Sequence, residues 1–360
     1  MVRKAPVWCG VAAVLAFAGA GCGPGGGTVA PPAGAAGGAG GPGFPVEVTD
    51  CEGARTTVGK APRAIVTSNA SALELLLRLG AGDRVAGTGF PPGAGTLPAE
   101  LDERARKVPV LGRTVIPKEK LLGSGADLYV DTFATVNRGG HGMGETATGE
   151  ELAAAGITRV FLKSTACAGT AKKPVTDLTA VADDIRTLGA LTGTGDKAAE
   201  LVAGMERKVE GVRAAVGAVP EEDRPTYFFF DYDAGTKQPV AVCNRQVAHA
   251  VITLAGARNV FADCDDTFRQ VGWEQVVAAD PDWIQLAVRN RGGAAATEKA
   301  FDEARAWLEG NAATRGLKAV KEGRYLRINS EATTIAGVRN AETVERIAAT
   351  LYPDKVKGGR

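Results

Sequence analysis

Residues 63–89, RAIVTSNASALELLLRLGAGDRVAGTG, contain a complete strand–helix–strand unit. The apolar run at 63–68 predicts a buried strand, and the run at 84–89 predicts a second one. Between them, residues 71–74 have the S-x-x-E spacing of a capping box, which predicts the start of a helix, and Gly80 is typical of a residue that ends one. Strands joined by a crossover helix run parallel, so this unit predicts an α/β fold with a parallel sheet.

The same alternation of apolar runs and helical segments continues to the end of the chain. In the first half, we expect strands at 127–133 and 159–164 and short helices at 118–122 and 150–155. In the second half, we expect strands at 226–232, 283–288 and 324–329, and helices at 246–254, 271–278, 297–308 and 341–351. Two such series predict two doubly wound lobes with mainly parallel sheets, whose ligands bind at the carboxyl ends of the strands.

Two helical stretches without a strand lie between these halves, at 177–191 and 196–216. The second has apolar residues at helical spacing and would be about 32 Å long at about 1.5 Å per residue. We therefore expect one long helix, within a linking segment at 176–218, to join an N-terminal lobe at 46–175 to a C-terminal lobe at 219–360. A helix is stiffer than extended strands, so little lobe closure is expected.

The first 21 residues have the pattern of a secretory signal peptide. Arg3 and Lys4 precede an apolar run of 15 residues at 7–21, which is short for a membrane span and ends in small residues. Cys22 follows Gly-Ala-Gly and resembles the lipobox cysteine of bacterial lipoproteins, which is acylated and becomes the first residue. An ordinary signal peptide followed by an incidental cysteine is the alternative.

Residues 22–45 are rich in Gly, Ala and Pro and predict a disordered tether. An anchor followed by a tether places the protein outside the cell interior, on the outer face of the cytoplasmic membrane. The other residues, about 315 of the 360, suffice for two domains. A net charge of +1 favours neither nucleic acid nor an anionic lipid surface as a partner, so we expect the lipid anchor to be the only contact with the membrane.

Four cysteines remain in the mature chain: Cys51, Cys167, Cys243 and Cys264. An even number of cysteines in an oxidising compartment predicts two disulfides, and no C-x-x-C spacing suggests a metal or redox site. Cys51 with Cys167 would join the two ends of the first lobe, whereas Cys243 with Cys264 would close a short loop in the second. Three pairings are possible, and the sequence does not distinguish them.

Four stretches of the mature chain resemble the substrate-binding lipoproteins of ABC importers for ferric siderophores, haem and cobalamin. They are PRAIVTSNASALELLLRLGAGDRVAGTG at 62–89, VPVLGRTVIPKEKLLGSGADLYVDT at 108–132, GWEQVVAADPDWIQLA at 272–287 and AGVRNAETVERIAATLYPD at 336–354. The resemblance covers nearly all of the mature chain and implies two α/β lobes joined by one long helix. It also implies an ABC permease and its ATPase as partners.

Glu119 and Glu274 each begin a short predicted helix that precedes a strand, one in each half of the chain. Their contexts match, with KEKLLGSGADLYV around the first and WEQVVAADPDWIQL around the second. The resemblance implies that carboxylates at these places dock onto arginines of the permease, and two separate exposed charges suit that role. The alternative is that acidic residues simply favour helix N-termini.

Ligand groups are expected just after the strands. The candidates are Phe90, Phe133, Arg138, His141, Tyr232, Arg245, Arg289 and Arg291, with Asn137, Asn244 and Asn290 beside them. Arginines at these places would bind carboxylate, hydroxamate or catecholate oxygens, and aromatic rings would contact a rigid chelate. Taken singly, each arginine is by default a solvated loop charge.

Only two histidines are present, which argues against a site for a bare metal ion. His249 lies in a predicted helix and is expected to be packed, whereas His141, in NRGGHGMG, could ligate haem iron. No G-x-S-x-G sequence is present, and we expect no enzyme activity.

The expected function is therefore capture of a ferric siderophore or a similar metal chelate for delivery to the permease. We expect a monomer with no resident cofactor. The alternatives are haem or cobalamin binding, and a sensing or carrier role without transport.

Overall fold

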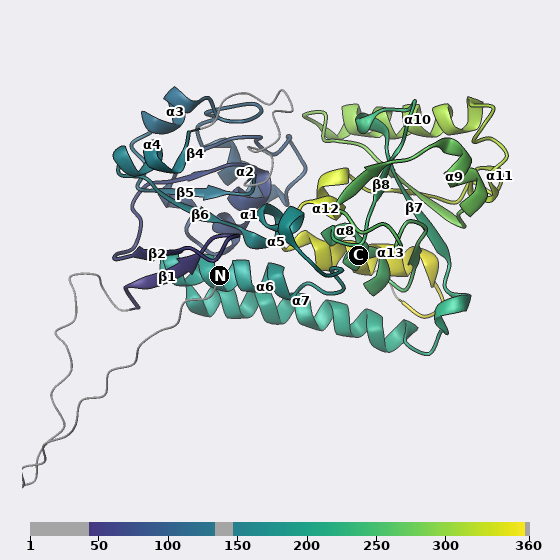
Figure 1. Cartoon of the computed structure of the whole chain (residues 1–360), viewed down its shortest axis with the longest axis horizontal. Coiled ribbons are helices and arrows are strands. Elements are labelled where there is room, and N and C mark those ends of the chain that lie inside the picture. The colour runs from purple at the N-terminus through teal and green to yellow at the C-terminus, as the bar shows by residue number, and fades with distance from the viewer. Residues whose placement is uncertain (1–42, 134–146, 357–360) are drawn as a thin grey trace, which may run out of the picture. The chain divides into compact units, whose positions relative to one another are not determined.

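A computed structural model describes residues 43–133 and 147–356. The predicted signal peptide and Cys22 lie outside the described residues, as do three candidate ligand residues: Asn137, Arg138 and His141. The described part contains two four-stranded parallel sheets, one in each half of the chain, and helices flank both (Figure 1). The prediction of an α/β fold with two lobes is confirmed.

The sheet of the first lobe has the strand order β4-β3-β5-β6, and every neighbouring pair is parallel. Its strands are β3 (Ile65–Thr67), β4 (Val85–Thr88), β5 (Leu128–Asp131) and β6 (Thr158–Phe161). Its helices are α1 (Ala70–Arg78), α2 (Ala99–Arg106), α3 (Lys118–Leu122), α4 (Gly149–Ala154) and α5 (Lys163–Ala166). Strands β3 and β5 are buried along their whole length, which explains why their sequences are mostly apolar rather than alternating.

The sheet of the second lobe has the strand order β12-β11-β7-β9 and is also parallel. Its strands are β7 (Thr226–Asp231), β9 (Arg258–Asn259), β11 (Trp283–Ala287) and β12 (Tyr325–Arg327). Its helices are α8 (Val247–Leu254), α9 (Trp273–Ala279), α10 (Ala294–Gly310), α11 (Lys318–Lys321), α12 (Ser330–Thr334) and α13 (Arg339–Leu351). The aromatic side chains of β7, Tyr227 to Phe230, are all buried in this lobe.

Two antiparallel pairs lie outside the parallel sheets and were not predicted. One is the hairpin of β1 (Val46–Thr49) and β2 (Arg55–Val58), and the other joins β8 (Val240–Val242) to β10 (Phe268–Gln270). Strand β10 is exposed at every position, and β2 is exposed at all but one. Neither strand therefore has the apolar run by which a strand is recognised in a sequence.

Two helices, α6 (Thr179–Thr192) and α7 (Gly195–Val216), follow the first sheet and precede the second in the sequence. They run side by side (Figure 1). Helix α7 has 22 residues and packs against α6 on one side and α13 on the other. Lys208 of α7 also pairs with Glu345 of α13 at 2.6 Å. The predicted long helix is present, and it packs on α6 of the linking segment and on α13 and α8 of the second lobe.

The predicted capping box at Ser71 and Glu74 is wrong. Helix α1 begins one residue earlier, at Ala70, and its N-cap is Asn69, whose side chain accepts a hydrogen bond from the backbone N–H of Ala72 at 3.1 Å. Asn is at least as good an N-cap as Ser, so the earlier polar residue starts the helix. Ser71 and Glu74 are thereby free to contact the other lobe.

The structure contains two disulfides, Cys51–Cys167 and Cys243–Cys264, and both are pairings described from the sequence. The Cα atoms are 5.1 Å apart in each, within the usual range for a disulfide. The first bridge ties the hairpin of β1 and β2 to the residue after α5, and the second lies within the C-terminal lobe. Neither bridge crosses between the lobes.

Asp184 of α6 caps the short helix α5. Its carboxylate accepts hydrogen bonds from the backbone N–H groups of Lys163 and Ser164, at 2.8 and 2.9 Å, and from the Ser164 hydroxyl. Burial raises the pKa of Asp184 to about 6, and these hydrogen bonds oppose the rise. Helix α5 in turn presents the Thr165 hydroxyl, which accepts a hydrogen bond from the backbone N–H of Ala336 in the second lobe at 3.2 Å.

Replacing Asp184 by Asn should remove a decrease in the free energy of unfolding that occurs as the pH rises. Folding raises the pKa of this carboxyl from 3.8 to about 6, so its contribution to the free energy of unfolding is greatest below about pH 4 and is lost as the pH rises through about 6. Over this pH range, the contribution of Asp184 to the free energy of unfolding falls by ~3 kcal/mol. Urea unfolding from acidic to neutral pH measures it, with Asp183→Asn, at the exposed neighbouring residue, as the control. Parallel stability profiles for the wild type and Asp184→Asn would contradict this assignment.

Candidate functional site

A groove of about 1240 Å³ is lined by residues that follow strands of both sheets. We call it the interlobe groove. On the first lobe it is lined by residues after β3, β4 and β5, and on the second by residues after β7, β11 and β12 together with the β8–β10 pair. This is the edge at which parallel α/β sheets bind ligands.

Two phenylalanine rings form an aromatic contact on the first-lobe wall. The ring centroids of Phe90 and Phe133 are 5.5 Å apart, and both residues are half-buried. Phe90 has a φ of +34°, and its backbone is held by hydrogen bonds to Ala70 at 3.0 Å and Thr114 at 3.3 Å. A left-handed conformation is unfavourable for a bulky residue, and it persists only where surrounding contacts impose it.

Asp131 positions the second of these rings. This buried carboxylate, at the end of β5, accepts a hydrogen bond from the backbone N–H of Phe133 at 2.9 Å. Burial raises the pKa of Asp131, with the hydrogen bond from Phe133 opposing the rise. The carboxylate therefore fixes the turn after β5, from which the Phe133 side chain reaches the groove.

Phe268 provides aromatic surface on the second-lobe wall. It lies on β10 and is 39% exposed, one of three large hydrophobic side chains that are exposed in the described part of the chain. Phe268 was not among the predicted site residues, because its strand has no apolar pattern. Its position on the groove follows from the pairing of β10 with β8, in which Phe268 lies opposite Val242.

Two arginines of the groove have guanidinium groups without a hydrogen-bond or ion-pair partner among the described residues. They are Arg113 on the first lobe and Arg289 on the second, and both are exposed. Arg113 was also absent from the predicted set. Burial raises the pKa of Asp231, which also lines the groove, and the charge of Arg289 opposes that rise. The groove thus offers one free cation on each wall.

The other arginines near these groups are already paired. Arg291 forms an ion pair with Asp233, which also accepts a hydrogen bond from the backbone N–H of Arg289 at 2.5 Å. Arg327 pairs with Glu298 at 2.9 Å and with Asp302 at 2.5 Å. These contacts hold the loop after β11 and the end of β12 and leave Arg289 as the unpaired cation of this wall.

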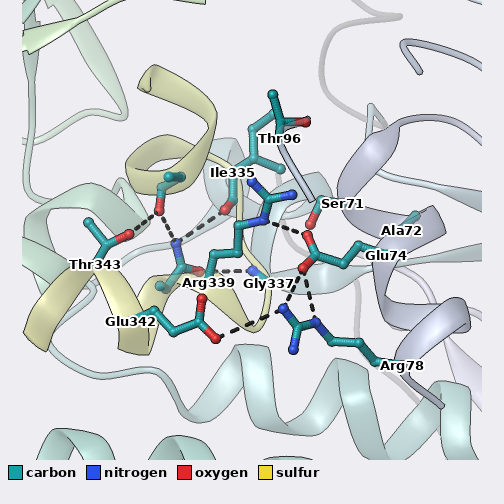
Figure 2. Close-up of polar contacts among 12 residues, drawn as sticks. Ser71, Ala72, Glu74, Arg78, Thr96, Ile335, Gly337, Arg339, Glu342 and Thr343 are labelled. Atoms are coloured by element: carbon teal, nitrogen blue, oxygen red, sulfur yellow. Dashed lines mark hydrogen bonds and ion pairs between the residues drawn. The ribbon is translucent and has the colours of Figure 1, made fainter. Parts of the chain in front are cut away.

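The floor of the groove contains a carboxylate shared between the two lobes. Figure 2 shows Glu74 of α1 between Arg78 of the same helix, at 2.8 Å, and Arg339 of α13, at 2.5 Å. The Glu74 side chain is only 4% exposed. Beside it, the Ser71 hydroxyl donates a hydrogen bond to the carbonyl of Ala336 at 2.7 Å. Side chains of α1 thus join the first lobe directly to the start of α13.

Of the candidate ligand residues that the structure describes, Phe90, Phe133, Arg289 and Arg291 line the groove, and Asn290 lies with them. Tyr232 and Arg245 are not among the residues that line it. The Tyr232 ring packs on Phe230, with the centroids 6.1 Å apart.

Arg245 is instead held within the second lobe and against the end of the first lobe. It pairs with Asp265 at 3.4 Å and Asp266 at 3.6 Å, and donates a hydrogen bond to the carbonyl of Ala171 at 2.9 Å. Asn244 beside it accepts a hydrogen bond on its backbone carbonyl from Val175 at 2.8 Å. These residues tie the end of the first lobe, at Ala171 and Val175, to the C-terminal lobe, which explains why they follow a strand without facing the groove.

Glu119 and Glu274 lie in the first turns of α3 and α9, as predicted. Both are exposed, and within the described residues neither carboxylate has a hydrogen-bond or ion-pair partner. Each is therefore available to a partner outside the chain.

The remaining titratable candidates are structural. His249 is buried in α8, 3.3 Å from the Asn259 amide, and burial lowers its pKa, as for a packed side chain. No group of three or more His, Cys, Asp or Glu side chains within 43–133 and 147–356 is arranged to hold a metal ion. In the same ranges, no helix combines the length and apolar character needed to cross a bilayer.

Comparison with known proteins identifies a family and relatives for this chain. A family model described as "Periplasmic binding protein" matches residues 65–332. The chain is 25% identical over 322 residues to an uncharacterized ABC transporter substrate-binding lipoprotein, YvrC, of Bacillus subtilis, covering 87% of this chain and 88% of YvrC. It is 26% identical over 326 residues to a cobalamin-binding protein of Halobacterium salinarum, covering 89% of this chain and 78% of that protein.

A similar solved structure is that of an ABC-type Fe3+-hydroxamate transport system from Saccharomonospora viridis. It matches with a TM-score of 0.68 and 26% identity, covering 86% of this chain and 99% of that chain.

Replacing Arg339 by Gln should lower the free energy of unfolding by about 1–3 kcal/mol, because the buried Glu74 carboxylate loses one of its two cationic partners. Chemical denaturation at neutral pH measures the change. The control is Arg305→Gln, which removes an exposed pair with Glu309 and should cost less than about 1 kcal/mol. If both variants were equally stable, Glu74 and Arg339 would not be a significant tie between the lobes.

Proposed function

Because the chain belongs to the periplasmic binding protein family, we propose that it is the substrate-binding component of an ABC importer. It captures a ligand outside the cytoplasmic membrane and delivers it to a permease and its ATPase, without catalysing a reaction itself. The observation that supports this most directly is the interlobe groove, which has aromatic surface and one unpaired guanidinium group on each wall.

We propose a ferric siderophore or a similar metal chelate as the ligand. Phe90, Phe133 and Phe268 offer ring faces to the flat or apolar parts of such a molecule. Arg113 and Arg289 offer charge-assisted hydrogen bonds to its oxygens. The similar solved structure is that of an Fe3+-hydroxamate transport system, which agrees with this ligand class.

Cobalamin and haem are the alternatives. A relative at 26% identity is named as a cobalamin-binding protein, which supports the first. Arg113 and Arg289 line the groove from different lobes and have no partner among the described residues. They favour a ligand with anionic oxygens on both sides, and that is the reason for placing the chelate first.

We further propose that the protein is a monomer held at the membrane by a lipid on Cys22, as the lipoprotein name of the relative YvrC suggests. The metal arrives inside the ligand, so no resident cofactor is needed. Glu119 and Glu274 are proposed to dock on the permease, because each is exposed, unpaired within the described residues and carried on its own lobe.

The ligand assignment is tested by thermal unfolding of the lipid-free mature chain with ferrioxamine B, a ferric catecholate, hemin and cyanocobalamin. A ligand at a hundred times its Kd adds about 2.7 kcal/mol to the free energy of unfolding. A ferric chelate should give the largest shift, and Arg113→Gln and Arg289→Gln should each weaken its binding about tenfold, which corresponds to about 1.4 kcal/mol. Arg305→Gln serves as the control.

A response to cyanocobalamin or hemin alone would overturn the chelate assignment and leave the importer assignment intact. Stabilisation by none of the four compounds would argue against both.

Replacing Glu119 and Glu274 together by Ala should abolish uptake of the ligand into cells while leaving its Kd unchanged, because the substituted side chains lie outside the groove. The matched control replaces Glu100 and Asp196, which are exposed acidic residues in the first turns of α2 and α7. Radiolabelled uptake and equilibrium binding separate the two effects. Normal uptake by the Glu119→Ala, Glu274→Ala protein would refute the docking role.

A further inference from the structure

Besides the floor of the groove and the hydrogen bonds of Thr165 with Ala336, Ala171 with Arg245 and Val175 with Asn244, the two lobes also meet at Gly93. A Cβ atom built on Gly93, in the loop after β4, would lie 2.0 Å from Oδ1 and 2.2 Å from Cγ of Asn290, in the loop after β11. Such a separation is far below van der Waals contact, so the backbone of Gly93 lies directly against the Asn290 carboxamide. Both residues line the groove, one on each lobe.

Both sides of this contact are held in place by their own lobes. The carbonyl of Gly93 accepts hydrogen bonds from the backbone N–H of Thr96 at 3.2 Å and from its hydroxyl at 2.7 Å. The backbone N–H of Gly95 is bonded to the buried Asp102 of α2 at 3.1 Å, and Pro91 and Pro92 restrict the start of the loop. We call residues 91–97 the gate loop.

Asn290 is fixed equally well on the other lobe. Its Oδ1 accepts a hydrogen bond from the backbone N–H of Gly292 at 2.8 Å, and its own backbone N–H donates to Glu331 of α12 at 3.1 Å. The carboxamide therefore cannot turn away from Gly93 without breaking the turn that it caps. Gly93 does not have a left-handed φ, so the close approach, and not the backbone conformation, requires glycine there.

The floor and the gate differ in strength. The floor is held by the buried ion pair of Glu74 and Arg339 and by the hydrogen bond from Ser71 to Ala336. Between Gly93 and Asn290, by contrast, the described residues form no hydrogen bond, only a contact of a few atoms, which is individually weak. The contact at the gate is therefore the weaker of the two.

We propose that the gate loop closes the groove against Asn290, and that ligand enters and leaves when this contact opens while the floor stays intact. The contact itself is independent of what the groove binds; its effect on ligand exchange rests on the proposed function. Substitution of Gly93 by a larger residue would hold the gate open without changing any group of the groove walls that we assign to the ligand.

The contact is tested by cross-linking. The Cβ atoms of Gly93→Cys and Asn290→Cys would be at most about 3.7 Å apart, since one C–C bond adds about 1.5 Å to the separation from Cγ, and this suits a disulfide. We expect the 93–290 bridge to form in the ligand-free chain under mild oxidation, as read by peptide mapping. Gly95→Cys with Asn290→Cys is the control, because a Cβ at Gly95 meets nothing within 4 Å. Absence of the 93–290 bridge, or an equal yield in the control, would overturn the proposal.

The gating role is tested by ligand exchange, using whichever of ferrioxamine B, the ferric catecholate, hemin and cyanocobalamin stabilises the wild type. The cross-linked protein should release this probe at least tenfold more slowly than the wild type. Gly93→Val should speed both binding and release severalfold. Unchanged release from the cross-linked protein would overturn the gate. If no probe binds the wild type, the proposed function fails, while the cross-link still decides whether the gate contact exists.

Discussion

The carboxylate of Glu74 is the point on which the arrangement of the two lobes depends. It is buried on a helix of the first lobe, and a buried charge needs a partner at short distance. Arg78 provides one from the same helix, and Arg339 provides the other from the second lobe. Because that second partner is on α13, satisfying the charge fixes where α13 begins relative to α1. The groove is the space that remains above this junction, bounded by the strand ends of both sheets.

Much of the fold was predictable because its signals are local. Strands such as β5 and β11 are buried and largely apolar, and the long helix α7 shows the spacing of an amphipathic helix. The hairpin β1–β2 and the pair β8–β10 were missed because β2 and β10 are exposed and have no such pattern, while β1 and β8 are only four and three residues long. At α1 the signal was misread, since Asn69 and Ser71 both suit an N-cap and only the three-dimensional structure shows which one acts.

The site was predictable only where position along a strand determines position in space. Phe90, Phe133 and Arg289 follow parallel strands and reach the groove, as the rule for such sheets requires. Tyr232 and Arg245 also follow strands. However, the Tyr232 ring packs on Phe230, and Arg245 forms ion pairs with Asp265 and Asp266. Phe268 and the pair of Glu74 and Arg339 depend on contacts between residues far apart in the chain, which a single sequence does not reveal.

The pairing of the cysteines follows their order along the chain: the first of the four joins the second, and the third joins the fourth. A polypeptide that crosses a membrane with its N-terminus ahead exposes Cys51 and Cys167 to the oxidising side before Cys243 and Cys264 emerge. Consecutive oxidation during export therefore leads to the native bridges, and we expect maturation to proceed without a disulfide isomerase. The disulfide of the first lobe can form before the cysteines of the second lobe are available for mispairing.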